Sequence, residues 1–264
     1  MAESCDDGTI NVRVTDDGVA HVELDRPARL NTLTERLVQD FHRALDDVTA
    51  SGARALVVTG TGRAFCAGRD LTEAVPGEDA EAVVREVFNP LVLRLAGFEI
   101  PTLAGIQGAC LGAGLGIALA CDVVVVEAQA KLGSPYRRLG AVLDVGLHDL
   151  MASRIGRGRT LELVYTGELV TGQEAARLGL VNRAVTGHEE LASELTALAQ
   201  HVAAGPTLAF RESKAIMRHW SAGASFEAVL DMEARAQGRA AQTADYQEGL
   251  AAFRLKRAPQ FRGA

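Results

Sequence analysis

The feature that most constrains this chain is an uncharged run that extends from Leu103 to Cys121 and ends directly on Asp122. The run is almost as long as a membrane-spanning helix. It is rich in Gly and Ala, contains Gln107, and lacks the flanking cluster of Lys and Arg that is typical of membrane spans. We therefore interpret it as a buried strand, a glycine-rich turn and a short buried helix within a globular core.

Strand and helix patterns alternate along the first part of the chain. Apolar residues alternate with others along residues 10–14 and again along residues 19–24. A turn sequence at residues 16–18 separates the two segments, which together predict a β-hairpin. Thr34 marks the start of a predicted helix, and a short apolar strand at 55–59 precedes a second helix at 81–95. This alternation predicts an α/β fold with crossover connections and a largely parallel sheet.

The strand patterns stop at about His188, and long helical patterns follow. They cover residues 188–204, 207–221, 225–241 and 243–256. We therefore divide the chain into a core over residues 1–187 and a helical region over residues 188–264. We expect the helical region to lie at an interface between subunits.

The composition is that of a globular protein and limits the classes of partner. Apolar residues make up 48% of the chain, which is enough for a sizeable core. The formal net charge is −7, from 27 basic and 34 acidic residues. This balance argues against nucleic acid or a membrane surface as a general partner, although a local basic site for a phosphorylated ligand remains possible.

The cysteines indicate a reducing compartment. Cys5, Cys66, Cys110 and Cys121 form no C-x-x-C pair, and the chain is too long for a disulfide scaffold. The acidic N-terminus has no apolar segment of the signal-peptide type, so we expect a cytoplasmic protein. The sequence contains no zinc-binding His pair and no dinucleotide, Walker or nucleophile-elbow motif, so no metal is predicted.

Two glycine-rich loops follow predicted strands. The first is GRAFCAGRDL at residues 62–71, and the second is QGACLGAGLG at residues 107–116, which runs directly into a helix. In parallel α/β sheets, ligands bind in loops at this end of the strands. Glycine lets the backbone approach a ligand closely, and a helix N-terminus adds partial positive charge. Two such loops can aim two amide N–H groups at one carbonyl oxygen, as in an oxyanion hole.

These motifs resemble those of the enoyl-CoA hydratase/isomerase (crotonase) superfamily. Residues 63–71 are similar to the family pattern A-F-x-A-G-x-D-L, and residues 108–122 are similar to its glycine-triplet motif. Further matches in the same order cover nearly the whole chain, at residues 25–31, 132–140, 165–167, 175–182 and 248–257. The resemblance implies a spiral α/β fold of ββα repeats and a C-terminal helical region that forms homotrimers or dimers of trimers.

The resemblance also implies an acyl-CoA substrate whose thioester oxygen is held by two backbone amides. Residue by residue, these amides belong to Arg69 and to Ala113, the latter at a position where the family usually has Gly. Coenzyme A is then part of the substrate, and no permanently bound cofactor is expected. The remaining implied substrate contacts are Ala67, Gly68, Asp70, Leu71, Gly112, Gly116, Tyr136, Ala28 and Leu30, with Arg63, Lys256 and Arg257 as candidates for the CoA phosphates.

Both glutamates that hydratases of this family use to activate water are replaced. The position two residues after the glycine triplet is Gly116, and the position after the proline of L-G-x-P is Tyr136. Glycine cannot transfer a proton, and a tyrosine with an ordinary pKa of about 10 is a poor base near neutral pH. Simple hydration is therefore disfavoured. Tyr136 could instead donate a hydrogen bond in the pocket or serve as wall packing.

Asp144 is the carboxylate that remains in this neighbourhood. It matches the acid/base position of the family's enoyl-CoA and dienoyl-CoA isomerases and the nucleophilic Asp of its aryl-CoA dehalogenase. A single carboxylate suits a one-base shuttle that moves a proton between two carbons of the acyl chain. The alternative is a helix N-cap, because a helix could begin near Gly146. His148 could be a second acid/base or a surface residue.

We therefore predict an enoyl-CoA isomerase in which Asp144 is the acid/base. The alternatives are a hydratase-like or hydrolytic enzyme, a lyase or decarboxylase, and an acyl-CoA binder without activity. The acyl group cannot be predicted from these motifs, because the residues expected to select it, at 72–98, contain none of them.

Overall fold

A six-stranded sheet forms the core of the protein in the computed structural model, which describes residues 8–264. The N-terminal strands form the predicted antiparallel hairpin, and the other four strands are parallel. The predicted α/β class is confirmed, and Cys5 lies outside the described residues. In sheet order the strands are β1 (Thr9–Val14), β2 (Val19–Asp25), β3 (Ala55–Gly60), β5 (Thr102–Ile106), β7 (Val123–Glu127) and β10 (Arg183–Val185).

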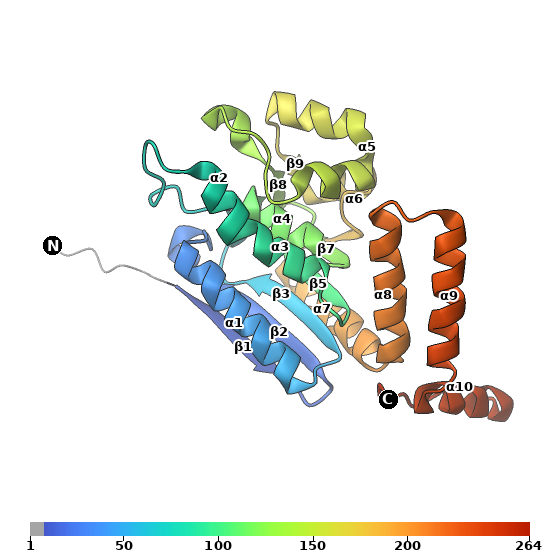
Figure 1. Cartoon of the computed structure of the whole chain (residues 1–264). Coiled ribbons are helices and arrows are strands. Elements are labelled where there is room, and N and C mark those ends of the chain that lie inside the picture. Colours follow the sequence, from blue (N-terminus) through green and yellow to red (C-terminus); the bar gives the residue numbers. More distant parts are fainter. Residues whose placement is uncertain (1–7) are drawn as a thin grey trace.

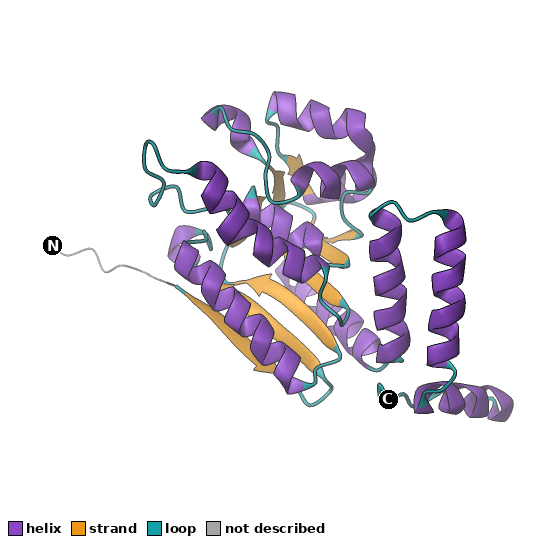
Figure 2. Ribbon diagram, viewed as in Figure 1, coloured by secondary structure: helices purple, strands orange, loops and turns teal. Residues whose placement is uncertain are grey.

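A second sheet of four short strands lies beside the first (Figure 2). Its order is β4 (Ala64–Cys66), β6 (Ala109–Leu111), β8 (Lys131–Gly133) and β9 (Val170–Thr171). Three of these strands directly follow β3, β5 and β7 and precede helical segments, which gives the expected ββα order. The glycine-rich loops run through β4 and β6, so this second sheet fixes both loops in space.

Helices cover both faces of the six-stranded sheet. On one face α1 (Glu35–Ser51) begins where the Thr34 side chain accepts the N–H of Leu37, and it buries an apolar stripe. On the other face α7 (His188–Ala203) packs on Ala55 and Val57 of β3 and on strands β5 and β7 (Figure 1). Since α7 completes the core, we place the start of the C-terminal helical region at α8 and not at residue 188.

The uncharged run folds inside the core as predicted. It forms β5, β6 and the helix α4 (Ala113–Ala120), and all residues of α4 are buried. Within residues 8–264, no helix is long and apolar enough to cross a membrane.

The remaining core helices connect the strands. The predicted helix at 81–95 is one continuous segment made of α2 (Ala80–Val83), the π-helical turn η2 (Val84–Phe88) and α3 (Asn89–Ala96). Short 3-10 helices, η1 (Pro27–Arg29) and η3 (Pro135–Leu139), border the loops. The others are α5 (Leu147–Thr166), which is broken at Gly156, and α6 (Gly172–Leu178).

Three C-terminal helices stand beside the core (Figure 1). They are α8 (Thr207–Ser221), α9 (Phe226–Ala240) and α10 (Ala244–Leu255), with bounds within one residue of those predicted. The tail returns to α10, where the buried Asp245 carboxylate accepts the N–H groups of Arg262 and Gly263 at 2.7 and 2.8 Å. Large apolar side chains on these helices are exposed, including Trp220 at 57% and Phe253 at 84%.

Candidate functional site

The first glycine-rich loop is held by two buried amide side chains, Asn31 and Gln107, and Gln107 donates to the carbonyl oxygens of Gly60, Gly62 and Ala64. Nδ2 of Asn31 donates to the carbonyl oxygens of Thr61, Ala64 and Phe65 at 2.8–3.1 Å, and its Oδ1 accepts the N–H of Arg26 at 2.8 Å. The loop therefore cannot move independently of the segment that joins β2 to α1.

The peptide of Arg69 is held from both sides by Leu33. Leu33 donates its N–H to the carbonyl of Gly68 and accepts the N–H of Asp70, each at 2.8 Å. This parallel bridge leaves the N–H of Arg69 itself without a hydrogen bond to any atom of residues 8–264. The amide is thus fixed in direction and available to a ligand.

Asp70 positions this loop through contacts within the protein. Its buried carboxylate pairs with Nη1 of Arg26 at 2.6 Å and accepts the hydroxyl of Thr72 at 2.7 Å. Burial raises the pKa of Asp70, but the hydrogen bonds from Thr72 and Arg26 outweigh it and bring the pKa to about 2. Because these partners occupy the carboxylate, we assign Asp70 a positioning role in place of the expected substrate contact.

The second loop places Ala113 at the start of α4. Gly112, at φ 51° and ψ −119°, precedes it in a conformation that favours glycine. The N–H of Ala113 belongs to the first turn of the helix, and it has no hydrogen-bond partner among the described residues. A Cβ on Gly68 would lie 2.9 Å from the carbonyl oxygen of Leu111 and 3.5 Å from the nitrogen of Ala113, so the two loops touch here.

Tyr136 and Asp144 form a hydrogen-bonded pair beside this second loop. The hydroxyl of Tyr136 donates to Oδ1 of Asp144 at 2.6 Å, and a Cβ on Gly112 would lie 3.1 Å from that hydroxyl. Burial and the neighbouring carboxylate raise the pKa of Tyr136, so the phenol remains a proton donor. The sequence leaves Tyr136 between two roles, a hydrogen-bond donor and a packed wall residue, and in the structure its hydroxyl donates to Asp144.

The protein environment of Asp144 raises the pKa of its carboxyl group above the ordinary value, so it favours the protonated form. Burial raises its pKa, while the hydrogen bond from Tyr136 and the charges of Arg69 and His148 act in the opposite direction. Such a carboxylate is a stronger base than a solvated one once it is ionised.

The alternative role for Asp144, that of a helix N-cap, does not match the structure. The N-cap of α5 is Gly146, which makes no side-chain cap, and the carboxylate of Asp144 is bonded to Tyr136 instead. His148 lies exposed in the first turn of α5, as expected for a surface residue.

Gly116 lies against the residue after Asp144. A Cβ at position 116 would lie 2.6 Å from Cγ2 and 2.9 Å from the carbonyl oxygen of Val145. Val145 has a positive φ of 48°, which is strained for a β-branched residue. A hydratase glutamate at this position would therefore collide with Val145, while the substrate contact expected of Gly116 stays a prediction.

The side chain of Arg69 is paired with Glu78, which lies nine residues further along the chain. Its guanidinium makes a two-pronged salt bridge with Glu78, with N–O distances of 2.6 and 2.7 Å. Glu78 belongs to the loop before α2, which also exposes Leu71 and Val75. The pair ties this loop to the residue whose amide faces the site.

The remaining predicted contacts fall into two groups. Ala28 and Arg63 are exposed, and Leu30 and Ala67 are half-buried, around the first loop, where the N–H of Ala67 donates to the carbonyl of Leu30 at 3.0 Å. Lys256 does not join them within one chain, because it follows α10, which lies at the far end of the molecule from α2 and α4 (Figure 1). Arg257 is paired with Glu248.

The thiols of the two loops are buried and unreactive. Burial raises the pKa of Cys66 to about 12 and that of Cys110 well above its ordinary value. Among residues 8–264, no cluster of three His, Cys, Asp or Glu side chains could hold a metal ion.

Several residues that build the site were not predicted from the sequence. Glu78 lies in no motif, and the sequence gives no signal for its pairing with Arg69 or for the packing of Val145 on Gly116. Asn31 was part of a matched motif, and its many hydrogen bonds now explain why an amide is needed there.

Comparisons with known proteins show the family to which this fold and its two paired loops belong. The sequence model of the enoyl-CoA hydratase/isomerase family matches residues 14–264, so the chain belongs to this family, whose members act on acyl-CoA.

Relatives and solved structures match over almost their full length. A Rhodobacter capsulatus protein named as a probable enoyl-CoA hydratase is 37% identical over 258 residues, which cover 97% of this chain and 98% of that protein. The 1,2-epoxyphenylacetyl-CoA isomerase of Escherichia coli is 33% identical, over 93% of this chain and 95% of its own. The structure of an enoyl-CoA hydratase from Bacillus anthracis has a TM-score of 0.91 at 29% identity, and the match covers 97% and 100% of the two chains.

Proposed function

We propose that this protein isomerises the double bond of an enoyl-CoA, with Asp144 as the single acid/base and with the amides of Arg69 and Ala113 holding the enolate oxygen. The observation that carries the proposal is the half-buried Tyr136–Asp144 pair next to the N-terminus of α4, where Gly116 leaves no second carboxylate.

The proposed reaction needs one base and conserves its proton. The carboxylate of Asp144 removes a proton from the carbon alpha to the thioester of a 3-enoyl-CoA, and the electron pair moves onto the thioester oxygen. The dienolate then takes the same proton from Asp144 at the gamma carbon, which gives the 2-enoyl-CoA. A positioned base contributes about 10²–10⁴ in rate, and each oxyanion donor about 10²–10³.

The names of relatives support two candidate reactions. The E. coli relative is named a 1,2-epoxyphenylacetyl-CoA isomerase, which supports isomerisation of an acyl-CoA in general but concerns an epoxide and not an enoyl-CoA. The R. capsulatus relative is named a hydratase, so hydration of a 2-enoyl-CoA is the second candidate, with Asp144 activating water. The missing carboxylates at positions 116 and 136 weigh against hydration.

The experiment that separates these candidates offers the purified protein each substrate in turn. With 3-enoyl-CoA we expect the absorbance of the conjugated thioester to rise, and Asp144→Asn should abolish the rise. With 2-enoyl-CoA we expect no loss of conjugation. Robust hydration by the wild type would overturn the isomerase assignment, and an active Asn variant would overturn the role of Asp144.

We also propose that the C-terminal helices assemble the protein into a homotrimer or a dimer of trimers. The exposed apolar residues of α8–α10, such as Trp220, Phe226 and Phe253, form a surface that a partner would cover. Light scattering that gives a trimeric or hexameric mass would support this assembly, and a monomeric mass would refute it.

A further inference from the structure

A second pocket lies between α8 and the core, on the side of α1 and α3. Its volume is about 610 Å³, which is within the usual range for small-molecule sites. None of the residues that line it belongs to the two glycine-rich loops or to the Tyr136–Asp144 pair. It is therefore separate from the proposed active site.

The charge of this pocket is opposite to that of the whole chain. Five arginines line it, with Glu99 as the one acidic residue among its lining side chains, although the chain carries a net charge of −7. The arginines are Arg54, Arg94, Arg211, Arg218 and Arg262. A concave surface lined by one sign of charge raises the local concentration of ions of the other sign.

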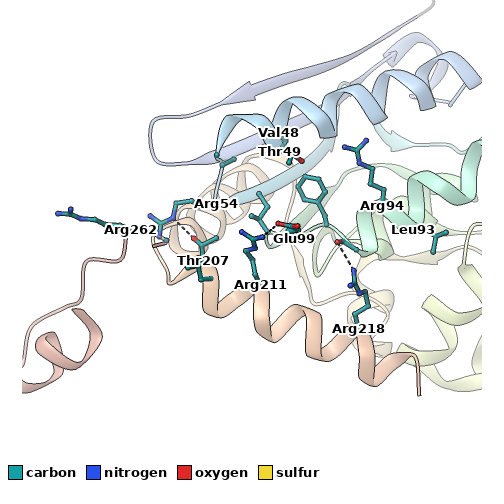
Figure 3. A pocket seen from close by; sticks show the side chains of 17 residues that line it. Val48, Thr49, Arg54, Leu93, Arg94, Glu99, Thr207, Arg211, Arg218 and Arg262 are labelled. Atoms are coloured by element: carbon teal, nitrogen blue, oxygen red, sulfur yellow. Dashed lines mark hydrogen bonds and ion pairs between the residues drawn. The ribbon is translucent and has the colours of Figure 1, made fainter. Parts of the chain in front are cut away.

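The arginines differ in how firmly they are held. Arg54 is occupied by Thr207 and by the carbonyl oxygens of Gly205 and Phe261. Arg262 points away from the others in Figure 3. These two therefore hold the C-terminal tail or face outward, and they do not carry the site.

Arg211 and Arg218 are the cations available to a ligand. They lie seven residues apart on α8 and therefore on one face of it, and both side chains extend toward the core in Figure 3. Arg218 has one long hydrogen bond, of 3.4 Å, to the carbonyl of Gly97. Arg211 is paired with Glu99, whose side chain is 72% exposed, and such a pair contributes little stability.

Apolar side chains complete the wall between these cations. Phe98, Ile100 and Leu208 line the same pocket, so its surface is part cationic and part apolar. Guanidinium groups bind phosphate with two parallel hydrogen bonds, and the carboxylate of Glu99 now occupies the place of such an anion on Arg211.

We propose that this pocket binds a phosphorylated small molecule that bridges α8 and the core. Its phosphate groups lie on Arg211 and Arg218, in exchange for Glu99, and its organic part packs on Phe98 and Leu208. Lys214 already joins α8 to the core through a 2.8 Å salt bridge with Asp122, and a ligand on Arg211 and Arg218 adds to this link and stabilises the position of the C-terminal helices.

The test is calorimetric titration of the full-length protein, in its native assembly and at constant ionic strength. The probes are inorganic pyrophosphate and uridine diphosphate, which lacks the adenine of coenzyme A. We expect saturable binding of both, with the nucleotide tighter because of the apolar wall. The double variant Arg211→Gln/Arg218→Gln should weaken binding by at least about tenfold, since each charged hydrogen bond is lost. Absence of saturable binding to the wild type overturns the proposal, including the case in which a partner subunit fills the pocket.

Two further variants distinguish a specific binding site from a non-specific effect of the net charge. Arg177→Gln/Arg235→Gln makes the same charge change on α6 and α9, outside the pocket, and should bind like the wild type. Glu99→Gln removes the competing carboxylate and should tighten binding by roughly two- to fivefold. Equal weakening in both double variants, or no gain with Glu99→Gln, overturns the assignment of Arg211 and Arg218.

Discussion

Replacing Tyr136 by Phe removes one hydroxyl from the proposed site and leaves the ring in place. In the wild type that hydroxyl donates to Asp144 at 2.6 Å, and both residues are half-buried. The hydrogen bond stabilises the ionised carboxylate, so it lowers the pKa of Asp144 against the effect of burial. Without it, the pKa of Asp144 should rise further.

The size of this rise follows from the hydrogen bond that is lost. A hydrogen bond to a charged group contributes about 1.5–3 kcal/mol. One pKa unit corresponds to about 1.4 kcal/mol, so the pKa of Asp144 should rise by about 1–2 units. A base must be ionised to act, so the acid limb of kcat/KM should move to higher pH by the same amount.

The assay is the pH profile of kcat/KM for 3-enoyl-CoA isomerisation, followed by the absorbance of the conjugated thioester. Tyr246→Phe, on α10, is the matched control, and its acid limb should coincide with that of the wild type. Thermal unfolding of both variants at the same pH values shows that the folded state is compared throughout. An unchanged acid limb in Tyr136→Phe would refute the reasoning, because Asp144 could not then be both the base and the partner of Tyr136.

Three further predictions concern single residues. Asp144→Asn should lose turnover but keep or raise the Tm measured by calorimetry, because burial makes the ionised carboxylate unfavourable near neutral pH. A large fall in Tm would instead mean that Asp144 has a structural role. Gly116→Glu should lower the free energy of unfolding by about 1–3 kcal/mol or more without creating hydration of 2-enoyl-CoA, because its Cβ meets Val145 at 2.6 Å; a stable, hydrating variant would contradict this. Asp70→Asn should cost about 2 kcal/mol at neutral pH, since the folded pKa of about 2 lies below the ordinary 3.8. Wild-type stability should therefore fall as the pH drops from about 4 toward 2, and denaturant titrations should show that the Asn variant lacks this part of the decline.

Helices such as α1 and the long strands could be predicted because they bury a periodic apolar face. The C-terminal helices were placed within one residue because their apolar residues recur at helical spacing, although most of these side chains are exposed in the single chain. The strands β4, β6, β8 and β9 were missed because segments of two or three residues are too short to show a period. Their sheet is defined by pairing between loops that are distant in sequence.

The site was predicted where backbone geometry leaves a mark in the sequence. Gly68 and Gly112 mark the two loops because their positive φ values favour glycine. The pairing of Tyr136 with Asp144 could not be predicted. The two residues are eight positions apart, and the segment between them has no regular helix or strand period that would place them side by side. The alternative of a helix cap does not match the structure because the chain turns through Val145 and Gly146 before α5 begins.

The contact between Gly116 and Val145 has a consequence for how this active site could change by mutation. Val145→Gly would remove Cγ2 and relieve the strained backbone, yet the carbonyl oxygen of residue 145 would still lie 2.9 Å from a new Cβ at position 116. No single substitution at either position, and no pair of them, makes room for a second carboxylate unless the backbone between η3 and α5 also shifts. A route from this site to a two-glutamate hydratase therefore requires a change in that connecting segment before a glutamate at position 116 can fit.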